Sequence, residues 1–180
     1  MDTIVARKGV MKYWNKSALI GVFAAIALGI GAVAVANVPD HPEDVVKYRK
    51  SFQQSLAVHM RLMKAVVKGK VSFTGHLADQ ARALQVSSKT LVDNLAVLFP
   101  AGTGADKLKT RARPEIWRDW KKFEAGAQKL SAETAKLVKI ANGGDMKAFA
   151  VQYKAVGKAC AACHKPFRAK KKRKKRKKRN

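Results

Sequence analysis

Two cysteines and one histidine near the end of the chain are the residues whose types and spacing point most clearly to chemistry. They form the run Cys160-Ala161-Ala162-Cys163-His164, which contains both cysteines of the sequence. The pattern C-x-x-C-H is typical of haem attachment, in which two thiols are joined to a porphyrin and the histidine binds its iron. Residues three and four apart on a helix lie on one face. A helix would therefore let both sulfur atoms reach one porphyrin edge while the imidazole turns toward the iron.

Two other kinds of site also use cysteine pairs. A thiol–disulfide centre is expected within a βαβ unit, and no strand pattern surrounds Cys160 and Cys163. A structural zinc site needs four ligands, whereas the other histidines are scattered and no second cysteine pair exists. We therefore expect one covalent haem c, with His164 as the axial ligand to its iron. Because no acid–base pair is positioned for turnover, we do not expect an enzyme.

Four segments carry apolar residues at three- and four-residue spacing, which is the pattern of an amphipathic helix. No segment alternates with period two over the length of a strand. The sequence therefore predicts an all-α protein whose four helices form an antiparallel bundle, with the haem domain over residues 37–169. Both cysteines share the apolar stripe of the fourth helix, so we expect the haem inside the bundle. The expected helices cover 42–69, 77–99, 114–142 and 146–167, with a Gly-rich basic loop at 101–113.

Residues 17–38 are apolar and uncharged, and they follow a basic segment. One interpretation is a cleaved signal peptide over residues 1–36, because Ala34 and Ala36 provide a small-x-small cleavage site. The other is an apolar membrane anchor helix, because about 20 apolar residues are enough to span a bilayer. In both cases the preceding positive charge stays in the cytoplasm. We therefore expect residues 37–180 to be exported to the periplasm.

The chain is strongly basic, with a formal net charge of +26, and every residue from 170 to 179 is lysine or arginine. The body of the chain is basic even without this polybasic tail, which we define as residues 170–180. Such a surface favours anionic partners, so we expect an anionic redox partner protein or an anionic membrane surface. Basic runs also bind nucleic acid, but export and the lack of aromatic residues in the run argue against it.

Five stretches spread over residues 42–168 are similar to a known family of haem proteins. Together with the single C-x-x-C-H near the C-terminus, they resemble the class II c-type cytochromes, meaning cytochrome c′ and its low-spin relatives. The resemblance implies an antiparallel four-helix bundle with one haem, and it leaves a homodimer open. The matching stretches are 42–51 (PEDVVKYRKS), 66–69 (VVKG), 98–104 (LFPAGTG), 113–117 (RPEIW) and 156–168 (VGKACAACHKPFR).

The resemblance also implies roles for residues around the haem. Arg49 matches an arginine that contacts the haem propionates, and Arg168 matches an arginine near the proximal face. The residue four positions after Arg49 faces the iron on the side opposite the histidine; it is methionine in low-spin members and usually a bulky apolar residue in cytochromes c′. Here that residue is Gln53, which departs from both patterns. Thr103 lies in the loop that borders the haem edge.

Gln53 lies on the apolar stripe of the first expected helix, where a buried polar group needs a partner. It is either a core glutamine bonded to another helix, or a distal group that bonds to a ligand on the iron or weakly ligates it. We favour the distal role. Met60 and Met63 lie further along the stripe, and we expect both in the core.

Two functions are compatible with such a haem protein. The leading one is a one-electron carrier whose iron cycles between Fe(II) and Fe(III), which the basic surface and an anchor would favour. The alternative is binding of a diatomic gas, nitric oxide or carbon monoxide, at an open or weakly held sixth position of the iron. The lack of a methionine at position 53 favours this alternative.

Overall fold

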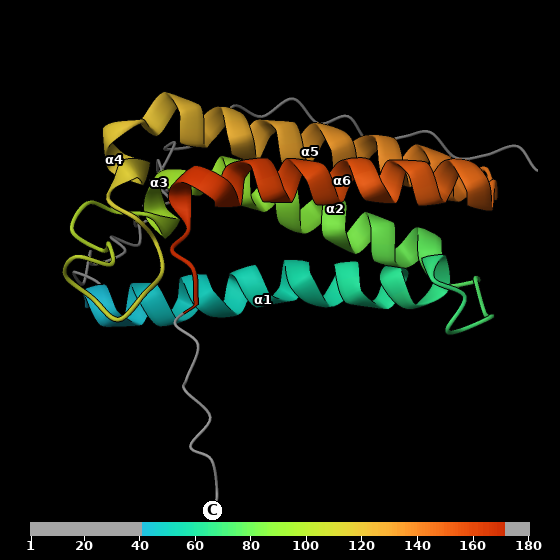
Figure 1. Ribbon diagram of the computed structural model, residues 1–180, viewed down its shortest axis with the longest axis horizontal. Helices are drawn as coiled ribbons and strands as arrows, with labels where there is room; N and C mark the ends of the chain where they lie inside the picture. The colour runs from blue at the N-terminus through green and yellow to red at the C-terminus, as the bar shows by residue number, and fades with distance from the viewer. Residues whose placement is uncertain (1–40, 172–180) are drawn as a thin grey trace, which may run out of the picture. The chain divides into compact units, whose positions relative to one another are not determined.

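The computed structural model describes residues 41–171, which form a bundle of four long helices with two short ones at one end (Figure 1). The described residues contain no strand, only an isolated bridge between Ala112 and Arg168. The predictions of an all-α protein and a four-helix bundle are therefore confirmed. The long helices are α1 (Pro42–Val67), α2 (Leu77–Asp93), α5 (Trp120–Asn142) and α6 (Met146–Phe167), and the short ones are α3 (Leu95–Leu98) and α4 (Glu115–Arg118).

Two sequence predictions concern segments beyond this bundle. The expected signal peptide or anchor helix over residues 1–36 lies outside the described residues, and so does the polybasic tail after Lys171. Within residues 41–171, no helix is both long enough and apolar enough to cross a membrane.

Two of the expected helices are interrupted next to the loop over residues 101–113. The second expected helix breaks at Asn94, whose side-chain amide donates to the Thr90 carbonyl oxygen at 3.0 Å. Such local bonds compete with the helical ladder, and the backbone of Asn94 leaves the helical region at φ −118° and ψ 23°. The third breaks at Asp119, at φ −113° and ψ 46°. The pieces cut off by these breaks are α3 and α4, which flank the loop.

Local sequence accounts for the ends of α1 and α6. Pro42 occupies the first turn of α1, where its missing N–H costs no hydrogen bond. Gly69, just past the end of α1, has a φ of 64°, which glycine adopts without strain. The Asp145 carboxylate caps α6 by accepting from the backbone N–H groups of Lys147 at 2.8 Å and Ala148 at 3.0 Å. A cap of this kind stabilises a helix by about 1 kcal/mol.

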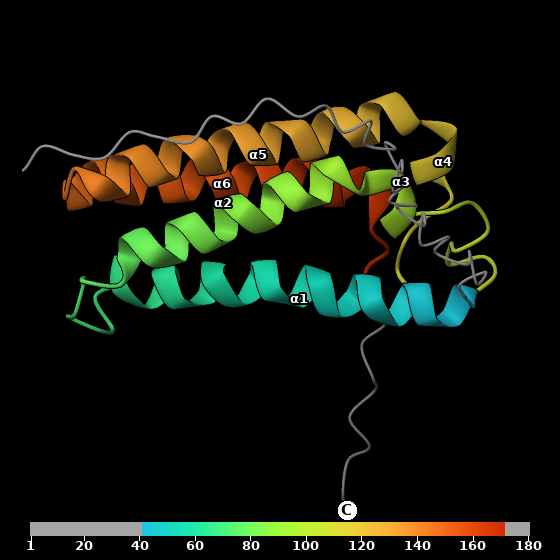
Figure 2. The same ribbon diagram turned by 180° about the vertical axis from the view of Figure 1, so that it is seen from behind.

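The core forms where the apolar stripes of the long helices meet. α5 packs on both α2 and α6, while α1 packs mainly on α2 and only locally on α6; Figure 2 shows this order from behind. Met63 is fully buried and Met60 packs against the core, as expected. The other large side chains at the centre are Leu84, Ile116, Leu137, Phe149 and Val156.

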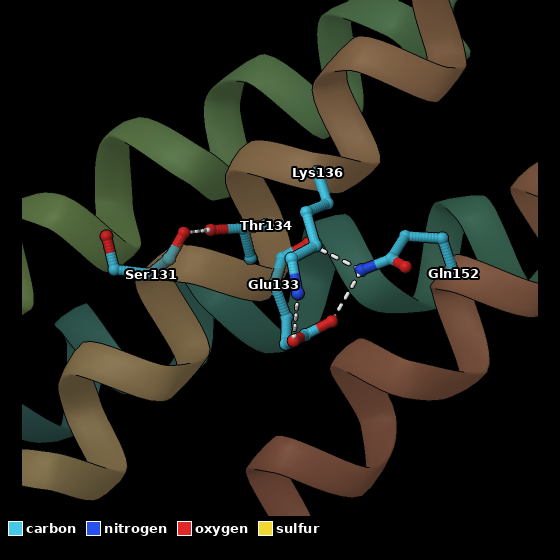
Figure 3. Close-up of polar contacts among 5 residues, drawn as sticks. All are labelled: Ser131, Glu133, Thr134, Lys136 and Gln152. Atoms are coloured by element: carbon cyan, nitrogen blue, oxygen red, sulfur yellow. Dashed lines mark hydrogen bonds and ion pairs between the residues drawn. The ribbon is translucent and has the colours of Figure 1, made fainter.

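Polar contacts also join the long helices inside the bundle. The hydroxyl oxygens of Ser88 on α2 and Thr134 on α5 are 2.7 Å apart, and neither residue has exposed surface. Between α5 and α6, the Gln152 amide donates to the backbone carbonyl of Glu133 at 2.9 Å and to its carboxylate at 2.7 Å (Figure 3). Lys136 pairs with the same carboxylate at 2.9 Å. These contacts hold α5 against α2 on one side and α6 on the other.

Candidate functional site

Cys160, Cys163 and His164 lie in the last two turns of α6, at the helical spacing that the motif predicts. Cys160 and Cys163 form no disulfide, are of intermediate burial and pack against the edge of the core. The buried residue of this turn is Ala159, so the cysteines lie beside the core stripe and not at its centre. The His164 side chain is exposed. The motif therefore lies at the boundary between the core and the surface.

The surroundings of the motif favour neutral side chains. Burial, and then the proximity of Cys160, raise the pKa of the Cys163 thiol to about 11. Burial also raises the pKa of Cys160. Both thiols are therefore protonated at neutral pH, unlike the low-pKa thiols of redox centres. Partial desolvation of the His164 ring, and then the charge of Arg111, lower the pKa of His164 below 6.5. The lower pKa favours the neutral imidazole, which is the form that binds metals.

Among the described residues, the motif has no neighbouring ligand set for zinc. In the part of the chain from residue 41 to residue 171, no group of three or more His, Cys, Asp or Glu side chains is placed to hold a metal ion. Four-coordinate zinc needs such a group. Of the chemistries considered for the cysteine pair, covalent haem attachment is therefore the one that the geometry supports.

One hydrogen bond shows which residues of α1 and α6 lie at the same level. The hydroxyl of Tyr153 on α6 donates to the carbonyl oxygen of Met60 on α1 at 3.0 Å, and the two helices run in opposite directions (Figure 1). Two turns back along α1, roughly 10 Å, lies Gln53. Two turns forward along α6 lies Cys160. Gln53 and Cys160 are therefore at the same level of the bundle.

The Gln53 side chain is half-buried. It makes no hydrogen bond with any residue of the described range 41–171. Of the two roles considered for Gln53, a core glutamine bonded to another helix is not what the structure shows. Its distal role toward a haem stays a prediction.

Arg49 lies one turn before Gln53 on α1, at the level of His164 on α6. The residue is 3% exposed, and its guanidinium carbon lies 4.6 Å from the centroid of the Phe99 ring. Desolvation lowers the pKa of Arg49 to about 10, so the side chain stays charged at neutral pH. Its guanidinium donates to Leu98 O at 3.2 Å, Thr103 Oγ1 at 2.9 Å, Thr103 O at 2.8 Å and Thr110 Oγ1 at 3.3 Å.

These four bonds occupy most of the donors of Arg49. A guanidinium has five N–H groups, so within residues 41–171 only the Nε–H of Arg49 is left without an acceptor. No carboxylate of this range lies within ion-pair distance of Arg49. The structure therefore gives Arg49 the role of holding the loop, and its contact with haem propionates stays a prediction.

The loop over residues 101–113 is held against the end of α6. Thr103 is 2% exposed, and its hydroxyl donates to the Pro100 carbonyl oxygen at 2.8 Å while accepting from Arg49. The exposed Arg168 follows α6 directly and forms the isolated bridge to the loop. Haem contacts of Thr103 and Arg168 stay predictions. The loop pairs with α6 through Arg113 N–H to Phe167 O at 3.0 Å and Ala169 N–H to Arg111 O at 2.9 Å.

Two residues beside the motif were not among the sequence predictions. Tyr153 belongs to the apolar stripe of the fourth expected helix, and nothing in its spacing distinguishes it from a core aromatic residue. Gly126 lies inside α5, where an added Cβ would make a tight contact with Cys163, 3.1 Å from its Sγ. A glycine inside a helical pattern is the signal that could have identified it, because such a glycine usually has a packing reason.

Comparison with known proteins shows to which family the chain belongs. The family model described as Cytochrome C′ matches residues 44–168, which is most of the chain and includes the whole motif. The chain belongs to the cytochrome c′ family. Cytochromes c′ are class II c-type cytochromes with covalent haem c, so haem c is the cofactor. The pair Cys160 and Cys163 is consistent with its attachment motif.

Individual cytochromes c′ match over most of their length. The protein from Rhodospirillum rubrum is 31% identical over 148 residues, covering 82% of this chain and 96% of the relative. The protein from Alcaligenes xylosoxydans xylosoxydans is 37% identical over 131 residues, covering 72% and 97%. The solved structure of cytochrome c′ from Rhodobacter Spheriodes has a TM-score of 0.68 at 29% identity, covering 73% of this chain and 100% of that one.

Two further solved structures carry small ligands. A nitric oxide complex of a cytochrome c prime mutant from Alcaligenes xylosoxidans has a TM-score of 0.63 at 33% identity, covering 72% of this chain and 97% of that one. A carbon monoxide-bound variant from the same organism has a TM-score of 0.63 at 32% identity, covering 72% and 98%.

The residues present here fit a haem c. Two protonated thiols and a neutral imidazole share the end of α6, and Arg49 provides a buried positive charge at the same level of the bundle. Bound haem supplies an iron that exchanges one electron and accepts axial ligands. Cys160 and Cys163 would attach it, and Arg49 holds the neighbouring loop.

Proposed function

We propose that this cytochrome c′ binds diatomic gases, nitric oxide or carbon monoxide, at the haem face opposite His164. The observation that carries the proposal is Gln53. It lies on α1 at the level of Cys160, it is half-buried, and its side chain makes no hydrogen bond within residues 41–171. Solved relatives with bound nitric oxide and carbon monoxide support the same proposal.

No methionine of α1 is placed to close the sixth position from the level of Gln53. Met63 is fully buried in the core. Met60 is bonded through its carbonyl oxygen to Tyr153, two turns away from Gln53, roughly 10 Å along the helix. A position without a strong protein ligand is open to a small molecule. The Gln53 amide has two N–H donors, which suits it to hydrogen-bond a ligand at that position.

The test is a spectroscopic titration of the purified holoprotein. Absorption and spin-state spectra of the ferric and ferrous forms are recorded with and without nitric oxide and carbon monoxide. We expect high-spin spectra that convert when either gas is added. Low-spin, six-coordinate spectra that do not respond to the gases would contradict gas binding.

A matched pair of variants tests the role of Gln53 within this function. Gln53→Leu removes the amide from the half-buried position, and Gln54→Leu makes the same change at the exposed neighbouring position. We expect Gln53→Leu to change gas affinity or the ligand stretching frequency and Gln54→Leu to leave both as in the parent protein. Equal behaviour of the two variants would show that Gln53 is not a distal group.

The second candidate function is one-electron transfer without gas binding, supported by the basic surface beside the motif. His164 is exposed, Arg111 is close enough to lower its pKa, and the exposed Arg168 and Lys170 follow directly. This surface suits an anionic redox partner or an anionic membrane surface, and salt would weaken either association. Reduction by an anionic reagent that slows as ionic strength rises would support it, whereas a rate independent of salt would not.

We further infer that the protein is not an enzyme and acts in the periplasm after export directed by residues 1–36. N-terminal sequencing of the exported protein separates a cleaved signal, which would give a start near Asn37, from a retained anchor. Recovery of the full chain in the cytoplasm, without covalent haem, would contradict export.

A further inference from the structure

Gly126 lies in the interior of α5 and approaches α6 at the attachment motif. A Cβ built on Gly126 would lie 3.1 Å from Cys163 Sγ and 3.3 Å from Cys163 Cβ. Carbon–sulfur and carbon–carbon contacts between unbonded atoms are ordinarily about 3.5–4 Å. Any side chain at position 126 would therefore meet the sulfur atom of Cys163.

The backbone of Gly126 gives no other reason for a glycine. Its φ is not in the positive range that disfavours other residues, and glycine is among the least favourable residues in a helix interior. Gly157 on α6 is a useful contrast, because a Cβ built there would meet no atom within 4 Å. Of these two glycines inside long helices, only Gly126 has Cys163 in the way of an added Cβ.

We propose that Gly126 is a positioning residue for covalent haem attachment, because it leaves the sulfur atom of Cys163 the room to form and keep its thioether bond. This inference rests on the haem attachment of the family and not on gas binding. The free thiol can rotate away from an added side chain. The thioether cannot, because its sulfur is bonded both to Cys163 Cβ and to the porphyrin.

The covalent step is balanced within the two reactants. The Cys163 S–H adds across a vinyl C=C bond of the haem, so that a C–S bond forms and the hydrogen goes to the other vinyl carbon. No electron is gained or lost, and no third reactant is consumed. Gly126 takes no part in this chemistry; it determines whether the sulfur atom can occupy the position that the addition requires.

The contact is specific to one of the two cysteines. The three atoms nearest to a Cβ at Gly126 all belong to Cys163, at 3.1–3.9 Å. A side chain at position 126 should therefore impair the second thioether and leave the first intact. A general loss of folding would impair both.

The first experiment compares Gly126→Ala and Gly126→Val with Gly157→Ala and Gly157→Val. Each variant is produced in cells that attach haem c to exported proteins. The denatured proteins are alkylated, and the free thiol at each cysteine is measured by peptide mass mapping. We expect free Cys163 thiol to rise about fivefold or more in Gly126→Val, as overpacking of this size would give, with less in Gly126→Ala. The α band of the pyridine haemochrome should move to longer wavelength, because one vinyl group stays unsaturated.

A second experiment isolates each thioether. Cys160→Ala leaves Cys163 as the sole attachment residue, and Cys163→Ala leaves Cys160. Adding Gly126→Ala should lower the fraction of haem that resists acid–acetone extraction in the first background but not in the second. Alanine raises helix propensity relative to glycine, so Gly126→Ala is the variant expected to fold even where Gly126→Val does not.

The proposal is overturned if Gly126→Val and Gly157→Val carry both thioethers to the same extent. It is equally overturned if Gly126→Ala lowers attachment alike in the Cys160→Ala and Cys163→Ala backgrounds. These outcomes are independent of gas affinity. Failure of the gas-binding proposal would therefore leave this one standing, and the reverse also holds.

Discussion

The guanidinium of Arg49 donates to both oxygen atoms of Thr103, which lies 54 residues further along the chain, at 2.9 Å to Oγ1 and 2.8 Å to the carbonyl oxygen. Through this pair, the start of α1 holds the loop that pairs with the end of the haem-bearing helix. The arginine is buried, so its bonds are shielded from water. The loop, α1 and the motif on α6 are therefore one connected unit.

The first prediction concerns this Arg49 contact. Arg49→Leu leaves the buried carbonyl of Thr103 without its donor, and hydrogen bonds to charged groups contribute about 1.5–3 kcal/mol each. We expect the free energy of unfolding in urea to fall by about 3 kcal/mol. The matched control is Lys50→Leu, since exposed Lys50 also donates to this loop, at 2.6 Å to the Lys109 carbonyl oxygen. Its loss should cost less than 1 kcal/mol, and an equal loss in the two variants would contradict the role of Arg49.

The second prediction concerns the buried hydroxyl pair of Ser88 and Thr134. Ser88 Oγ also lies 2.9 Å from the Gln85 carbonyl oxygen and Thr134 Oγ1 lies 2.8 Å from that of Ser131. Each hydroxyl has one proton, so at most two of these three bonds form at once. Thr134→Val should lower the free energy of unfolding by about 1–2 kcal/mol. The double variant with Ser88→Ala should lose less than the sum of the two single losses; strict additivity would show that the hydroxyls are not coupled.

The third prediction is a pH dependence at Glu133. Its bonds to Lys136 and then to Gln152 lower the pKa of this carboxyl below its ordinary value of 4.5. The folded protein therefore binds this proton less readily than the unfolded chain, so the carboxylate stabilises the fold above pH 4.5. We expect Glu133→Gln to unfold more readily than the parent at pH 7. The difference should shrink as the pH falls below 4.5 and vanish once the folded carboxyl is protonated.

Urea unfolding at a series of pH values measures the Glu133 effect. Glu124 provides the matched control, since it lies on the same helix and forms no ion pair within residues 41–171. At pH 7, Glu124→Gln should cost less stability than Glu133→Gln, because it removes no ion pair. If the loss of unfolding free energy in Glu133→Gln does not depend on pH, the contact of Glu133 with Lys136 and Gln152 (Figure 3) acts through packing and not through charge.

The bundle was predictable because helix formation depends on a local signal, the three- and four-residue spacing of apolar side chains. The haem motif was predictable for a similar reason, because its residues are close in sequence. The helix breaks at Asn94 and Asp119 were not predictable from the sequence. Each depends on whether a side chain or the loop gives the backbone a better hydrogen-bond partner than the next turn of the helix does.

Contacts between helices also could not be predicted from the sequence. Thr134 is a polar member of an apolar stripe, and its spacing says nothing about the partner, Ser88 on another helix. The same holds for Tyr153, whose bond to Met60 shows that Gln53 is level with Cys160. Register between helices depends on how whole surfaces fit together, and a single sequence does not record that fit.

The last prediction uses this register to ask which residue faces the iron. If Gln53 lies on the distal side, Gln53→Met should place a thioether sulfur near the sixth position, as in the low-spin relatives. We expect the ferric and ferrous spectra to become low-spin and six-coordinate. A gas would then have to displace the sulfur, so carbon monoxide affinity should fall by about tenfold or more for a ligand bond worth roughly 1.4 kcal/mol.

The matched control for this substitution is Gln54→Met, which adds the same side chain at the exposed neighbouring position on α1. It should keep the parent spectra and carbon monoxide affinity, because successive helical residues point about 100° apart. A high-spin Gln53→Met protein with unchanged affinity would show that α1 presents another residue to the iron. Leu56 would then be the next candidate, since it is the following buried residue of α1 after Arg49 and lies one turn beyond Gln53.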